Sequence, residues 1–132
     1  MNSVIVLVGR ILLSAIFILS GFGKLTDISG TAAYFAMFHL PATTLVAVGA
    51  GLIELFGGLA ILVGFQTRTA AWVLALFSIA SALIAHMNWA DTMQLINFEK
   101  NLAIAGGFLL LAIYGPGALS VDALRGVKRT TA

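Results

Sequence analysis

Cysteine is absent from the 132 residues, and charged side chains make up only 9% of them. The missing cysteine excludes disulfides, thiol redox chemistry, cysteine-ligated zinc and iron–sulfur clusters. A soluble domain of this size carries roughly a quarter charged residues, because it must wet a large surface. Seven basic and five acidic residues are too few for that, and a net charge of +2 is too small for a nucleic-acid-binding surface. We therefore expect neither a soluble domain nor a nucleic-acid partner.

Apolar residues are what the chain has in excess, at 61% of the sequence and a mean hydropathy of +1.08. This fraction excludes a disordered chain. A bilayer core about 30 Å thick needs roughly 20 apolar residues per helix, so four helices and short connections use nearly the whole chain. The apolar runs are continuous rather than alternating, which argues against membrane strands. The sequence predicts an all-α membrane protein, with one domain over residues 1–132 built as a bundle of four transmembrane helices.

The polar interruptions set the expected boundaries. Membrane spans are expected at about residues 4–22, 43–65, 69–86 and 98–114. The aromatic stretch TAAYFAMFHL, residues 31–40, is too short to cross and predicts an interfacial helix between the first two spans. We expect a polar loop at 88–97 and a frayed or interfacial tail at 120–132.

Basic residues indicate the orientation of the four spans, which place both termini on one side. That side carries Arg68, Arg125, Lys128 and Arg129. The other side carries Lys24 and Lys100. By the positive-inside rule, we expect both termini to face the cytoplasm.

Two charges fall where a membrane helix should have none, Arg10 in the first span and Glu54 in the second. Each costs about 2.5 to 3.5 kcal/mol in hydrocarbon, so both should face the bundle interior. Their neighbours at helical spacing form one stripe on each span: Arg10, Ser14, Phe17, Gly21 and Lys24 on the first, and Ala47, Ala50, Gly51, Glu54, Gly57 and Gly58 on the second. We expect a central Arg10–Glu54 ion pair, which would either bind a ligand or proton or only fix the register of the helices.

A second polar group gathers at the opposite mouth of the bundle, where Lys24, His86 and Asn101 end or begin spans. The candidate binding residues are Arg10, Lys24, Glu54, His86 and Asn101. The simpler interpretations are that His86 is an interfacial hydrogen-bonding residue and that Lys24 is a snorkelling span end. His39 and His86 could clamp a haem in principle, but nothing fixes their relative position, so neither haem nor metal is expected.

Three stretches resemble the DoxX family of small four-helix bacterial membrane proteins, in particular its YphA-like branch of the inner membrane. They are RILLSAIFILSGFGK at 10–24, ELFGGLAILVGFQTR at 54–68 and INFEKNLAIAGGFLLLAIYGPGALSVD at 96–122. Arg10, Lys24, Glu54 and Asn101 are the polar residues that match the family pattern. The resemblance implies a multi-pass inner membrane protein. It also implies relatives linked to quinone-coupled sulfur oxidation beside a second protein, or to complexes that protect against oxidative stress.

Three functions follow as hypotheses. The first is a redox-associated subunit, not an enzyme on its own, that binds a quinone-like or other small amphipathic molecule and works with a protein partner. The second is a structural or assembly scaffold of the membrane without catalytic activity. The third is a small transporter, which is weaker because four spans would need to oligomerise and inverted repeats are not evident. Lipid is an expected contact in each case, and the small-residue stripes permit a homo-oligomer.

Overall fold

The computed structural model describes residues 2–126, and within them the regular structure is entirely helical. The helices are α1 (Ser3–Thr26), α2 (Ile28–Ala36), α3 (Thr43–Val63), α4 (Thr67–Ala85), α5 (Thr92–Tyr114) and α6 (Val121–Leu124). Four of them, α1, α3, α4 and α5, are long and apolar enough to cross a membrane. The expected all-α membrane fold, with four spanning helices and a short helix between the first two, is confirmed.

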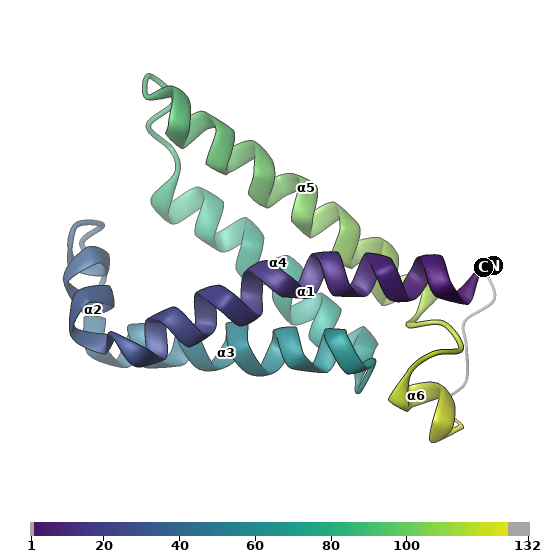
Figure 1. Cartoon of the computed structure of the whole chain (residues 1–132). Helices are drawn as coiled ribbons and strands as arrows, with labels where there is room; N and C mark the ends of the chain where they lie inside the picture. Colours follow the sequence, from purple (N-terminus) through teal and green to yellow (C-terminus); the bar gives the residue numbers. More distant parts are fainter. Residues whose placement is uncertain (1, 127–132) are drawn as a thin grey trace.

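The four long helices form two pairs that diverge (Figure 1). Helix α1 packs along α3, and α4 packs along α5. The pairs converge near α6 and separate toward α2, which stands at the open end of the molecule (Figure 1). Between the pairs, α1 meets α5 where the Phe17 and Phe108 rings make an edge-to-face contact, with centroids 5.4 Å apart. The divergence of the pairs leaves room for a cavity beside α2.

Small residues set the close approach of α1 and α3. A Cβ atom added at Gly21 would lie 2.8 Å from the carbonyl oxygen of Gly51, and one at Gly58 would lie 2.9 Å from the Ile18 side chain. The stripe predicted on α1 is buried at Arg10, Ser14, Phe17 and Gly21. That on α3 is buried at Ala47, Ala50, Gly51, Glu54 and Gly58. The sequence therefore predicted the inward faces of both helices correctly.

The apolar core lies where all four long helices approach one another. It is formed by Phe17, Ile61, Ala70, Ala71, Leu74, Ala75, Phe108, Leu111 and Ala112. Alanines on α4 let the larger side chains of the other helices interleave, which is the usual way that membrane helices pack without a hydrophobic driving force between them.

Two helices begin earlier than expected, and a side-chain cap accounts for each. The carboxylate of Asp27 accepts a hydrogen bond from the Gly30 backbone N–H, so α2 begins at Ile28 rather than near residue 31. Asp91 accepts from the Met93 N–H at 3.0 Å, so α5 begins at Thr92 rather than near 98. Much of the polar stretch expected to be a loop is therefore the first two turns of α5.

Candidate functional site

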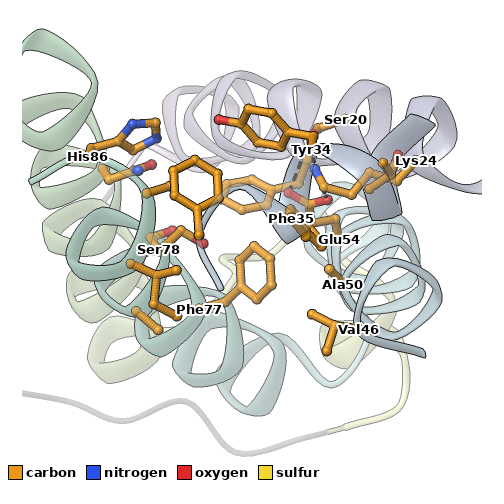
Figure 2. Close-up of a pocket in the computed structure, with 18 of the residues that line it drawn as sticks. Ser20, Lys24, Tyr34, Phe35, Val46, Ala50, Glu54, Phe77, Ser78 and His86 are labelled. Atoms are coloured by element: carbon orange, nitrogen blue, oxygen red, sulfur yellow. Dashed lines mark hydrogen bonds and ion pairs between the residues drawn. The ribbon is translucent and has the colours of Figure 1, made fainter. Parts of the chain in front are cut away.

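A cavity of about 600 Å³ lies between the two helix pairs on the side of α2 (Figure 2). All five helices from α1 to α5 contribute to its wall. Much of the lining is apolar and aromatic, including Phe17, Tyr34, Phe35, Phe38 and Phe77. Its polar side chains include two groups, one on α1 and α3 and one around the α4–α5 connection.

The first polar group is a triangle of Ser20, Lys24 and Glu54, held by two hydrogen bonds and one ion pair. The Lys24 Nζ atom lies 2.7 Å from Glu54 Oε2 and donates to Ser20 Oγ at 2.7 Å. Ser20 Oγ in turn donates to Glu54 Oε1 at 3.2 Å. Ser20 and Lys24 stand one turn apart on α1, and the close packing of α1 on α3 brings both to Glu54. The carboxylate, 7% exposed, thus has a cationic partner inside the spanning region.

The second polar group lies across the cavity, where Figure 2 shows His86 on the opposite side from Lys24 and Glu54. His86 follows the last residue of α4, and its Nδ1 atom is 2.7 Å from Oε1 of Gln94 in the first turn of α5. The indole N–H of Trp89 donates to the His86 carbonyl at 3.1 Å, which holds the connection between the two helices. Asn101, about two turns further along α5 than Gln94, also lines the cavity. Gln94 was missed because its stretch was expected to be a loop.

The expected Arg10–Glu54 ion pair is wrong. Arg10 donates from Nη1 to the Pro116 carbonyl at 2.8 Å and from Nη2 to the Leu62 carbonyl at 3.1 Å. The reason is the helix register: Gly21 faces Gly51, so Glu54 lies near Lys24, whereas Arg10 lies near the end of α3. At 1.5 Å per residue, the α1 positions of Arg10 and Gly21 are separated by about 16 Å. Arg10 consequently does not line the cavity, unlike Lys24, Glu54, His86 and Asn101.

His39, the second histidine considered for haem ligation, also lies outside the cavity wall. It follows α2 in a backbone turn, with φ at +58°, and its side chain is exposed. The two histidines do not share a site. Among residues 2–126, moreover, no three His, Asp or Glu side chains are grouped as metal ligands.

The segment after α5, residues 115–126, closes the other end of the molecule. The Asp122 carboxylate accepts hydrogen bonds from the Gln66 and Thr67 backbone N–H groups, each at 2.9 Å. The Asp122 N–H donates to the Gly64 carbonyl at 2.8 Å. Burial alone would raise the pKa of Asp122, but the hydrogen bonds from Thr67 and Gln66 and the nearby charge of Arg125 hold that pKa below its ordinary value.

Over residues 120–126 this C-terminal segment is ordered rather than frayed, whereas Lys128 and Arg129 lie outside the described residues. Asp122 is buried and satisfies the first N–H groups of α4. The sequence signal for this contact was Asp122, a single acid in a basic tail. It comes two residues after Ser120, whose hydroxyl caps α6 by accepting from the Ala123 N–H.

A second arginine ties the ends of helices at the same side of the molecule. Arg68, in the first turn of α4, donates from Nη1 to the carbonyls of Ala112 and Ile113 in the last turn of α5. Arg10 does the same for Leu62 in the last turn of α3. Carbonyls at a helix C-terminus lack intrahelical partners and carry partial negative charge, so cations stabilise them. These arginines hold the converged end together, whereas the other four candidate binding residues, Lys24, Glu54, His86 and Asn101, line the cavity.

Comparison with known proteins agrees with the resemblance seen in the sequence. The DoxX family model matches residues 5–87. Inner membrane protein YqjF of Escherichia coli (strain K12) is 48% identical over 123 residues, which cover 93% of both chains. Inner membrane protein YphA of the same organism is 40% identical over 124 residues, covering 90% of this chain and 89% of the relative. No solved structure matches the chain significantly. The chain belongs to the DoxX family and is a multi-pass inner membrane protein.

Proposed function

We propose that the cavity binds a small amphipathic molecule with a flat, oxygen-bearing head group, of the quinone kind, and that the protein does so as one subunit of a membrane redox complex. One observation carries the proposal: the Lys24–Glu54 ion pair forms part of the wall of a 600 Å³ cavity rather than being packed solid. An ion pair with only a structural role needs no such space beside it.

The dimensions and chemistry of the cavity support a ligand of this class. Pockets for small molecules commonly measure about 300 to 1,000 Å³, with apolar walls and a few polar groups that fix the orientation of the ligand. Here aromatic side chains such as Tyr34, Phe35 and Phe77 lie between Lys24 on one side and His86 on the other (Figure 2). A flat ring would stack on the aromatic side chains and direct its oxygens toward the two polar groups.

The Ser20–Lys24–Glu54 triangle is suited to an oxygen atom that changes its protonation state. An ammonium group has three N–H donors; that of Lys24 directs one to Ser20 and lies 2.7 Å from Glu54 Oε2 as an ion pair. A further N–H can donate to a ligand oxygen. Glu54, through its contacts with Lys24 and Ser20, holds the ammonium group beside that oxygen. Quinones exchange electrons as well as protons, so the proposal includes a partner protein that supplies or accepts the electrons.

The first test is direct. The protein would be purified in native lipid discs and analysed by mass spectrometry for co-purified quinone, and then titrated with a short-chain benzoquinone. We expect binding in the folded wild type. Lys24→Met should weaken it roughly ten- to a hundredfold, since a hydrogen bond to a charged group contributes roughly 1.5 to 3 kcal/mol. Lys100→Met, an exposed lysine outside the cavity wall, is the matched control and should bind normally.

A second variant guards against loss of folding in Lys24→Met. Ser81 lines the cavity from α4, whereas Leu83 on the same helix is 56% exposed and does not. Ser81→Phe should block binding and Leu83→Phe should leave it unchanged, with both proteins keeping the helical circular dichroism of the wild type. If folded wild type neither retains nor binds a quinone, the proposal fails and the scaffold hypothesis is favoured.

A further inference from the structure

We infer that His86 makes this cavity selective for a ring that presents a hydroxyl group, and thus for the reduced quinol over the oxidised quinone. The inference rests on the proposed function and names the form of the ligand that the site prefers. It comes from the contact between the His86 and Gln94 side chains, which the ion pair on the opposite wall does not require.

That contact fixes which nitrogen of the imidazole carries the hydrogen. Nδ1 of His86 lies 2.7 Å from Oε1 of Gln94. With the Gln94 amide oriented as the structure has it, Oε1 accepts and Nδ1 donates, whereas a half-turn of the amide would reverse the two roles. In the neutral ring the other nitrogen, Nε2, is then an acceptor. Within residues 2–126 no group hydrogen-bonds Nε2, and His86 lines the cavity, so we infer that Nε2 is an acceptor available to a ligand there.

An acceptor distinguishes the two oxidation states of the ligand. A quinol hydroxyl can donate to Nε2, whereas a quinone carbonyl has no hydrogen to donate and would face Nε2 lone pair to lone pair. The opposite wall is less selective, because Lys24 can donate to either a carbonyl or a hydroxyl oxygen. The amide of Asn101 has both a donor and an acceptor and accommodates both forms. The selectivity therefore depends on His86, and Gln94 acts on it as a positioning residue.

The expected preference is modest. A net neutral hydrogen bond, together with the acceptor that the quinone leaves unpaired, corresponds to roughly a three- to tenfold difference in dissociation constant. His86 is only partly buried, so water can partly satisfy Nε2 when a quinone is bound. We do not expect the several-thousandfold discrimination of a fully buried site.

The test compares three ligands on the full-length protein in lipid discs under anaerobic conditions. They are a short-chain benzoquinol, the matching benzoquinone and the dimethyl ether of the same quinol, each titrated by calorimetry. The quinol should bind three- to tenfold more tightly than the quinone. The dimethyl ether has the electron-rich ring of the quinol but no hydroxyl hydrogen, so it should lose that advantage.

Variants locate the effect. His86→Phe keeps a ring but removes the acceptor, and should bring the quinol-to-quinone affinity ratio close to one while the quinone still binds. Gln94→Leu frees the imidazole to exchange its hydrogen between nitrogens and should reduce the ratio in part. His39→Phe, a histidine outside the cavity wall, should leave the ratio unchanged. A merely structural role of His86 would lower both affinities together and leave the ratio intact.

The outcomes separate this inference from the proposal beneath it. Binding of both rings with equal affinity, or tighter binding of the quinone, overturns the selectivity and leaves the proposed function standing. A wild-type ratio that persists in His86→Phe also overturns it. Failure of folded wild type to bind any of the three ligands would instead overturn the proposed function, and the selectivity with it.

Discussion

Arg10 is 2% exposed, and its guanidinium donates to two backbone carbonyls of other segments rather than pairing with a carboxylate within 4 Å. The two charges buried in the spanning region therefore have separate partners, two backbone carbonyls for Arg10 and Lys24 for Glu54. Arg10 and Glu54 therefore have different roles instead of the shared one expected of an ion pair. Arg10 joins the end of α3 to the segment that follows α5, whereas Glu54 faces a cavity.

A first prediction concerns Arg10. Replacing it with Met leaves the carbonyls of Leu62 and Pro116 unpaired in a buried site. The free energy of unfolding should fall by about 3 kcal/mol, because hydrogen bonds to charged groups contribute roughly 1.5 to 3 kcal/mol each. Thermal unfolding in mild detergent measures the change. Lys100→Met at an exposed position should change stability by no more than about 0.5 kcal/mol. Loss of ligand binding with unchanged stability in Arg10→Met would contradict the structural role.

For single residues, the sequence predicted which charged side chains are buried but not which groups they contact. Arg10 and Glu54 were expected to face inward because an exposed charge in hydrocarbon is costly, and both are buried. The acceptors of Arg10 are carbonyls, which every residue has, so they leave no signal in the sequence. Lys24 was placed with the polar mouth but not with Glu54, since the choice between two cations depends on a helix register that composition does not set.

Among the helices, α1 and α3 depend on glycine at one point of contact. A Cβ at Gly21 would meet the backbone of α3, with the Gly51 oxygen at 2.8 Å and the Leu55 Cα at 2.9 Å. Backbone cannot move aside as a flexible side chain can. The helices must therefore separate to admit even a methyl group, and the Lys24–Glu54 contact one turn away would lengthen with them.

The second prediction follows from this contact. Gly21→Ala should lower the free energy of unfolding by about 2 kcal/mol, in the range of 1 to 3 kcal/mol typical of overpacking. Gly23→Ala is the matched control on the same helix, because nothing lies within 4 Å of a Cβ placed there. That change should be neutral or stabilise by up to about 1 kcal/mol through helix propensity. Equal effects of the two substitutions, measured by thermal unfolding, would show that the close packing is not as described.

The third prediction concerns the junction of α4 with the C-terminal segment. The pKa of Asp122 lies below its ordinary value, so its ionised form stabilises the fold at neutral pH. That stabilisation should be complete above about pH 5 and lost as the pH falls through about 4 toward the lower folded-state pKa. Asp122→Asn should cost roughly 1 to 2 kcal/mol at pH 7, as the loss of a helix cap does. Its melting temperature should fall less steeply than that of wild type between about pH 5 and 3. Parallel melting curves for the two proteins over that range would contradict the role of Asp122.

The helices themselves could be predicted because long apolar runs admit few alternatives in a membrane. Their ends were less predictable where a short-range cap extends a helix into polar sequence, as Asp91 does for α5. Contacts between distant ends were not predictable at all. Asp122 and Gln66 lie 56 residues apart, and no periodicity connects them.

The whole molecule is asymmetric from end to end. At one end arginines and the C-terminal segment fasten α3, α4 and α5 together, and at the other the helix pairs diverge around the cavity (Figure 1). Ligand exchange belongs at the open end, where α2 and the α4–α5 connection form the rim.

The fourth prediction concerns orientation. The fastened end carries Arg68 and Arg125, so the positive-inside rule places it in the cytoplasm and the cavity toward the outer face. A fluorescent protein that matures only in the cytoplasm, fused after Ala132, should fluoresce. A fusion inserted between Asn88 and Asp91 should not. The reverse pattern would invert the topology and place the cavity on the cytoplasmic side.

The hydrogen bond from Arg10 to Pro116 joins residues that are 106 positions apart. During synthesis α1 enters the bilayer before Pro116 leaves the ribosome. The Arg10 guanidinium therefore lacks one of its two acceptors at that stage. Arg10 lies within two turns of the start of α1, close enough for its long side chain to reach the headgroups in the meantime. The segment after α5 therefore supplies one of the two acceptors of an arginine on α1, and a chain interrupted after α5 would lack it.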